Sequence, residues 1–133
     1  MNSHRNSIRT AAIFCGLVVA TYAAMVLGSP ADPATNNNSA WAYATSPDAA
    51  KRNGSRAVRL AKIACTQTQY TNTTMVGTLA AAYAEAGQYT EALLAAQRAC
   101  AMAQAQGETN LLRFNQELMT LYETGRPYHE EPR

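Results

Sequence analysis

The sequence predicts an all-α protein, and three observations support this fold class. Residues 75–100 place small residues at helical spacing on both sides of a glycine. A related pattern occurs about thirty-five residues earlier, within residues 39–65. An amphipathic stretch, residues 109–125, follows both copies. Two helix-turn-helix units closed by one further helix account for all three patterns.

Residues 10–28 form an uncharged apolar segment, and Arg5 and Arg9 precede it within the basic segment 1–9. At about 1.5 Å rise per residue, a helix of this length nearly spans the ~30 Å hydrocarbon core of a membrane. The segment predicts either a transmembrane anchor or a signal sequence cut before Asp32. We favour the anchor, because the apolar run is longer than signal sequences usually have.

The positive residues before the apolar segment are expected to stay in the cytoplasm. The predicted topology is therefore single-pass, with a cytoplasmic N-terminus and the helical repeats on the extracytoplasmic side. If the segment is cleaved, the chain is instead secreted or periplasmic. Residues 29–38 are assigned as a linker, although their Asn-rich end is also compatible with the first turn of the next helix.

Small residues recur every four positions inside the apolar segment. Such a ridge allows membrane helices to approach closely, so it offers a contact for a homo-oligomer. The alternative is that anchors and signals are simply rich in alanine. The candidate membrane-helix contacts are Gly16, Ala20 and Ala24.

The clearest repeat pattern lies in residues 75–100, where two helices are expected to meet at a tight turn. The small residues let the helices approach, and the tyrosines fill the wedge between them. The residues expected to pack this repeat are Leu79, Ala80, Tyr83, Gly87, Tyr89, Ala92, Ala96 and Ala99.

Residues 39–65 form an earlier copy of the pattern with two departures. Ser39 stands where the second copy has Leu79, and the connection 46–54 is longer than the turn at Gly87. Trp41 is expected to supply some of the missing apolar volume. The alignment places Ala57, Ala61, Ala64 and Cys65 at the positions of Ala92, Ala96, Ala99 and Cys100.

The spacing of these residues resembles the tetratricopeptide repeat (TPR), whose period is about thirty-four residues. The resemblance implies a short TPR-like α-solenoid over residues 39–125, with about two helix-turn-helix repeats plus a C-terminal capping helix. Residues 126–133 then form a polar tail. The segments SAWAYATSPD and GRPYHE are similar to the C-terminal repeats of bacterial membrane-associated TPR proteins.

The resemblance also implies a binding surface, because ligands of the family often lie in the groove lined by the first helix of each repeat. Gly77 and Ala81 stand where the family's clamp for C-terminal carboxylates has polar side chains. Binding of a carboxylate is therefore disfavoured, whereas a groove of small residues is compatible with a partner helix. The candidate partner-binding residues are Trp41, Thr74, Gly77, Thr78, Ala81, Ala84 and Glu85.

Charge suggests one further surface. Arg52, Arg56 and Arg59 follow helical spacing and form a candidate basic patch for anionic lipid or an acidic partner, or else an ordinary solvated face. The chain carries a net charge of only +2. Nucleic acid is not an expected partner, since such binding needs a broad positive field.

No catalytic residue, metal site or cofactor is predicted, so the chain is not expected to be an enzyme. His129 lies in the tail, and no nucleophile, phosphate or zinc motif is present. Cys65 and Cys100 are expected to be small buried thiols, because equivalent positions of successive repeats lie too far apart for a disulfide.

The sequence therefore predicts a membrane-tethered protein–protein interaction scaffold. One alternative is a permanent structural accessory subunit of a larger membrane or extracytoplasmic assembly. Another is a non-catalytic tail of a larger membrane protein.

Overall fold

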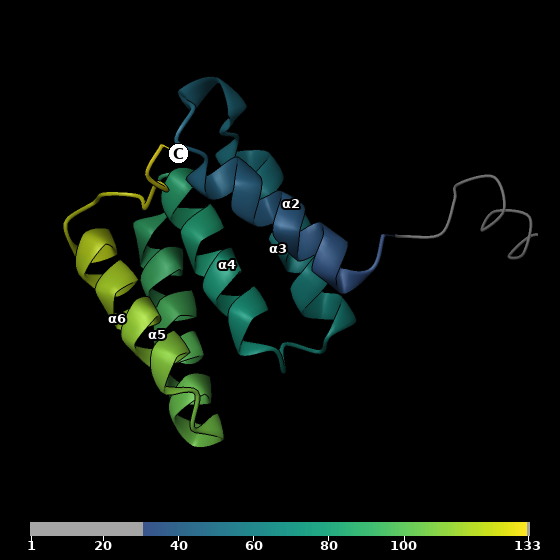
Figure 1. Ribbon diagram of the computed structural model, residues 1–133, viewed down its shortest axis with the longest axis vertical. Coiled ribbons are helices and arrows are strands. Elements are labelled where there is room, and N and C mark those ends of the chain that lie inside the picture. Colours follow the sequence, from purple (N-terminus) through teal and green to yellow (C-terminus); the bar gives the residue numbers. More distant parts are fainter. Residues whose placement is uncertain (1–30, 133) are drawn as a thin grey trace, which may run out of the picture. The chain divides into compact units, whose positions relative to one another are not determined.

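The computed structural model describes residues 31–132, and these residues contain helices and no strands (Figure 1). The predicted all-α class is confirmed for this part of the chain. Residues from Asp32 onward form one compact unit. Its elements are α2 (Pro33–Thr45), the 3₁₀ turn η1 (Ala49–Lys51), α3 (Gly54–Gln67), α4 (Thr73–Glu85), α5 (Tyr89–Gln106) and α6 (Thr109–Glu123).

Within residues 31–132, none of the helices has the length and apolar character needed to cross a membrane. The predicted anchor or signal at residues 10–28 lies outside the described residues. The basic segment 1–9 and the candidate contacts Gly16, Ala20 and Ala24 lie outside them as well.

Helix α2 begins at Pro33, inside the segment assigned as a linker from the sequence. The Asp32 carboxylate caps the helix by accepting a hydrogen bond from the Thr35 backbone N–H at 3.0 Å. Proline fits the first helical position because its fixed φ suits the helix and no N–H is needed there. The linker assignment is therefore wrong for residues 33–38, which belong to the helix.

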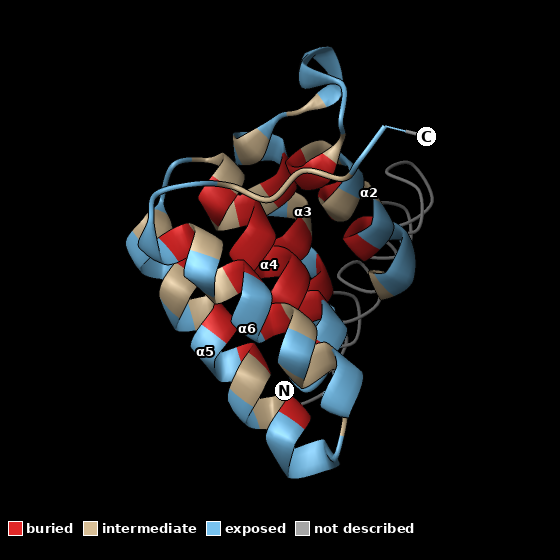
Figure 2. Cartoon of the chain, turned by 60° about the vertical axis from the view of Figure 1, so that its left-hand side comes forward, coloured by how far each residue is buried: buried red, intermediate tan, exposed pale blue. Residues whose placement is uncertain are grey.

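Helix α4 occupies the centre of the unit and packs against all four other helices. Figure 2 shows it almost entirely buried, whereas the outer helices keep exposed faces. Its alanines Ala80 and Ala82 expose none of their surface, and Ala84 exposes 1%. Side chains of this size let helices pack closely on several sides, which explains why α4 is rich in alanine and shows no polar face.

The first residue of α3 packs directly against the end of α4. A Cβ atom added at Gly54 would lie 2.6 Å from the Ala86 backbone, so only glycine fits this contact. Gly87 follows at the turn into α5 with a φ of +75°, a conformation that other residues adopt at a cost. Two glycines thus fix how α3, α4 and α5 meet.

The C-terminal residues do not extend into solvent as a polar tail. After α6 the chain runs back to the end of α2, where the Glu130 N–H donates to the Thr45 carbonyl at 2.8 Å (Figure 1). Tyr128 packs against both Trp41 and Phe114, with ring centroids 5.9 and 5.8 Å away. The tail therefore packs against α2, the first helix of the stack.

Candidate functional site

A pocket of about 260 Å³ opens between α2, α4 and α6. Trp41 on α2 and Phe114 on α6 are half-buried aromatic walls, with ring centroids 6.1 Å apart. Asn38 and Thr74 are exposed at its rim. The lining residues are Asn37, Asn38, Trp41, Thr74, Gly77, Thr78, Leu111, Phe114, Asn115 and Leu118, none of which is charged.

The floor of the pocket contains a buried amide, Asn115, whose side chain is 2% exposed. Its Nδ2 donates to the Leu111 carbonyl at 2.8 Å, which fixes the orientation of the amide. The amide oxygen Oδ1 takes no part in this hydrogen bond. Across from this oxygen lies Gly77, where an added Cβ would be only 2.8 Å from Asn115 Oδ1. The glycine therefore makes room for the amide oxygen.

Two lining residues carry a buried hydrogen-bond acceptor without a donor. Asn115 Oδ1 and Asn37 Oδ1 have no hydrogen-bond partner in the part of the chain that the structure describes. Asn37 is 9% exposed, so both oxygens sit in largely dehydrated surroundings. An unsatisfied buried polar group costs about 1–3 kcal/mol, which a bound molecule with a suitable donor would recover.

The structure brings four of the predicted partner-binding residues into this pocket: Trp41, Thr74, Gly77 and Thr78. Ala81 and Ala84 are only 2% and 1% exposed and belong to the core, so they do not line a groove. These two alanines are covered because α4 packs against all four other helices of the unit.

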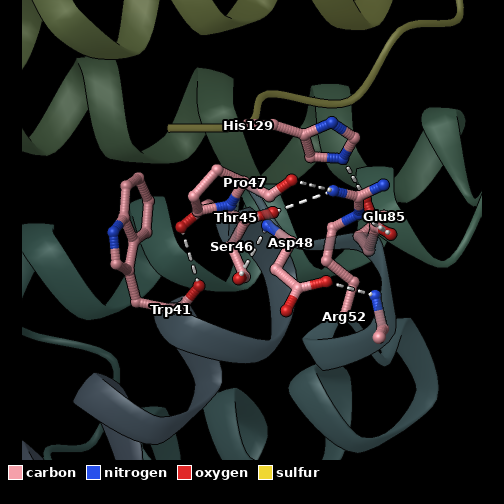
Figure 3. A network of polar contacts seen from close by, with 9 residues as sticks. Trp41, Thr45, Ser46, Pro47, Asp48, Arg52, Glu85 and His129 are labelled. Atoms are coloured by element: carbon pink, nitrogen blue, oxygen red, sulfur yellow. Dashed lines mark hydrogen bonds and ion pairs between the residues drawn. The ribbon is translucent and has the colours of Figure 1, made fainter. Parts of the chain in front are cut away.

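Glu85, the last predicted partner-binding residue, is held in a polar network instead (Figure 3). Its carboxylate accepts a hydrogen bond from Arg52 Nε at 3.2 Å and pairs with His129 Nε2 at 2.7 Å. Arg52 also donates to the carbonyls of Ser46 and Pro47, at 2.8 and 3.3 Å. The network ties the loop after α2, the end of α4 and the tail together.

A histidine beside a carboxylate is also the arrangement of an oriented general base. Neither His129 nor Glu85 lines the pocket described above. The pair joins two distant segments, and the side chain of Glu85 is 15% exposed. We therefore assign the network a structural role, so that Glu85 joins segments of the chain and, like Ala81 and Ala84, does not line the pocket.

The three arginines of the predicted basic patch do not form one helical stripe. Arg52 precedes α3 and is engaged with Glu85. Arg56 and Arg59 are exposed on α3, and the Arg56 guanidinium lies 4.5 Å from the centre of the Tyr43 ring. Arg52 does not share a helical face with Arg56 and Arg59, because Asn53 caps α3 and the helix begins at Gly54.

The residues predicted to pack the second repeat lie at or near the core. Leu79 is 5% exposed, and the tyrosines Tyr83 and Tyr89 are half-buried at its edge. Gly87 is exposed at the turn. The alanines Ala80, Ala92, Ala96 and Ala99 expose none of their surface, and the same holds for Ala57, Ala61 and Ala64 of the earlier copy.

Cys65 and Cys100 are free thiols, the first buried and the second partly exposed. Burial raises the pKa of Cys65 to about 11, and it also raises the pKa of Cys100. A raised pKa keeps both thiols protonated at neutral pH. Among residues 31–132, no group of three or more His, Cys, Asp or Glu side chains is placed to hold a metal ion.

Sequence reasoning missed the amide residues of the pocket, Asn37, Asn38 and Asn115. For Asn115 a signal was present, because it lies four residues after Leu111 and three before Leu118 on the apolar face of α6. A lone amide within such a stripe indicates a buried polar group with a specific partner or ligand. Asn37 carried no such signal, since it stands in a polar run.

Comparison of the sequence with models of protein families gives no match, and neither the curated proteins nor the solved structures contain a matching one.

Proposed function

We propose that this chain is a membrane-tethered scaffold that binds a protein partner in the pocket between α2, α4 and α6. The observation that carries the proposal is the pocket itself, which joins an aromatic wall to two buried acceptors without donors. Uncharged pockets with a few placed polar groups are typical of binding sites. The proposed role is non-catalytic and needs no cofactor or metal.

The TPR-like interpretation of the fold supports this proposal. Helices α2 and α3 correspond to the first repeat, α4 and α5 to the second, and α6 to the capping helix. Each helix packs against the next along the chain, as expected for a solenoid. In such an arrangement α2 and α4 are the first helices of their repeats, and these two helices supply most of the pocket's polar lining.

The tether belongs to the proposal through residues 10–28, whose uncharged apolar sequence suits a membrane anchor. The helical unit would then lie on the extracytoplasmic side. Intact mass of the chain in membrane and soluble fractions, with protease accessibility on the same cells, tests this part. Membrane-bound chain that retains residues 1–28 and exposes its helices outside supports the tether. A soluble chain that starts near Asp32 contradicts it.

Partner binding is tested by proximity labelling from the full chain in its membrane. We expect a defined partner to be labelled by the unmodified chain and lost on Thr74→Arg, which places a charge at the rim of the uncharged pocket. Thr90→Arg is the matched control, because Thr90 is an exposed threonine on α5 that does not line the pocket. Labelling of the same proteins by all three chains would contradict the proposed site.

A further inference from the structure

We propose that the pocket between α2, α4 and α6 receives a tryptophan side chain of the partner protein. This inference rests on the proposed scaffold function and deepens it, because it names the chemical group that the pocket recognises. Four properties of the pocket carry it: its volume, its lack of charge, its unpaired acceptors and its aromatic walls.

The volume of the pocket restricts the occupant to about the size of one large side chain. Sites for drug-sized ligands or cofactors usually enclose about 300–1,000 Å³, and this pocket encloses about 260 Å³. That is room for one large side chain of a partner rather than for a cofactor. Single aromatic residues that insert into such pockets commonly dominate the affinity of protein interfaces.

The lining restricts the charge of the occupant. No residue that lines the pocket carries a charge. A lysine, arginine, carboxylate or phosphate would therefore lose water without gaining an ion pair, which opposes binding. A neutral group is the suitable occupant.

The unpaired acceptors restrict the occupant further. Asn37 Oδ1 and Asn115 Oδ1 both lack a donor, and no buried donor without a partner lines the pocket in the described part of the chain. An occupant that only donates therefore matches the lining best. The tryptophan indole has one N–H donor and no acceptor, whereas phenylalanine has neither and tyrosine has both.

The walls fit an aromatic ring. Trp41 and Phe114 face the pocket with their ring centroids 6.1 Å apart and their planes inclined by 52°. The indole N–H of Trp41 is already donated to Glu130 Oε1 at 2.7 Å, which holds this wall in place. Tyr128 already contacts both rings, and a further ring inside the pocket can contact them at the tilted or edge-to-face angles that aromatic groups prefer.

The test compares two neutral probes that differ mainly in one donor, using the ¹⁵N-labelled full chain in detergent solution. N-acetyl-tryptophanamide is titrated against its benzothiophene analogue, in which sulfur replaces the ring N–H. We expect the tryptophan probe to bind about tenfold more tightly, since it supplies a donor to a buried acceptor. The amide of Gly77 and the side-chain amides of Asn37 and Asn115 should shift together.

Two variants on different helices keep the test independent of one side chain. Gly77→Ala crowds Asn115 Oδ1, and Asn37→Ala removes the other acceptor. The indole has a single N–H, which pairs with one acceptor at a time, so at least one of the two variants should reduce the tenfold preference for the indole, while Thr90→Ala on α5 should leave it unchanged. An unchanged preference in both variants would contradict donation to these oxygens. Equal affinity of the two probes, or shifts confined to residues outside the pocket, would overturn the proposal.

Failure of this inference is distinguishable from failure of the scaffold function. A partner that is still lost on Thr74→Arg, together with equal affinity for both probes, would retain the scaffold and reject the tryptophan. Pocket resonances of the unliganded chain that change on dilution would show a second copy as the occupant and would also reject it.

Discussion

At the scale of single residues, the pairing of Gly77 with Asn115 shapes the pocket. The glycine lies inside α4, where it lowers helix stability by about 1 kcal/mol relative to alanine. Its place is explained by Asn115 Oδ1, which an added Cβ would approach to 2.8 Å. Gly77 lowers the stability of α4, and the adjacent Asn115 Oδ1 has no hydrogen-bond donor among the described residues. Local costs of this kind are common at functional sites.

A double-mutant cycle tests this pairing. Gly77→Ala alone should destabilise the chain by about 1–2 kcal/mol, because overpacking outweighs the gain in helix propensity. In an Asn115→Ala background the same change should be neutral or stabilising, since the clash is gone. The measurement is urea unfolding of the four chains. Equal effects of Gly77→Ala in both backgrounds would show that the two residues do not interact.

The thiols give a second prediction at this scale. Because the thiolate is the nucleophile, Cys65 with its pKa of about 11 should react with iodoacetamide at pH 8 roughly a hundredfold more slowly than in the unfolded chain. Cys100, which is less buried, should react before Cys65. Peptide mapping by mass spectrometry separates the two sites, and labelling of Cys65 first would contradict the described burial.

The raised pKa of Cys65 also makes the stability of the fold depend on pH above 9. The unfolded thiol ionises near its ordinary pKa of 9.0, whereas the folded thiol keeps its proton until about 11. Between these pH values the unfolded state binds fewer protons, so the contribution of Cys65 to stability is complete below pH 9 and falls as the pH rises.

At the scale of elements, the tail and α2 depend on each other. The Trp41 indole N–H donates to Glu130 Oε1, and the Glu130 N–H donates to the last carbonyl of α2. Tyr128 covers the Trp41 ring. The tail therefore holds one aromatic wall of the pocket in position.

Fluorescence tests this dependence, because Trp41 is the sole tryptophan of the chain. Glu130→Ala should shift its emission to longer wavelength and lower stability by about 1 kcal/mol, since it removes one partly buried hydrogen bond. Glu131→Ala is the matched control, because Glu131 is exposed. Identical emission from both variants would mean that the tail does not hold Trp41.

The sequence predicted the elements whose buried faces follow a local period. Helices α4 and α5 and the apolar face of α6 were predicted because small or apolar residues recur in them at helical spacing. The start of α2 was missed, although Asp32 followed by Pro33 is a recognisable start signal. An Asn-rich run gave no apolar period that would have extended the helix back to it.

The tail and the pocket were harder to predict for a different reason. The hydrogen bond from Trp41 to Glu130 joins residues 89 positions apart, and no local pattern encodes it. The pocket likewise needs α6 beside α2 and α4, so its floor at Asn115 depends on tertiary packing. The candidate residues on α4 were therefore identified only in part, and Ala81 and Ala84 turned out to be core.

At the scale of the whole molecule, residues 31–132 form a small helical unit whose C-terminal tail packs against α2 and whose uncharged pocket opens between α2, α4 and α6. The segment at residues 10–28 would hold this unit at a membrane. Its small residues offer one further prediction, a contact with a second copy inside the membrane. Gly16→Ile should weaken self-association in a membrane two-hybrid assay, and unchanged association would remove this contact.

The most direct test of the central claim is site-specific photocrosslinking from the pocket rim in native membranes. A photoreactive residue at Thr74 should give one covalent adduct with a protein partner, and the same residue at Thr90 should not. Gly77→Ala, which crowds Asn115 Oδ1 at the floor of the pocket, should reduce the yield from Thr74. No adduct from Thr74, or the same adducts from both positions, would contradict a scaffold that binds its partner between α2, α4 and α6.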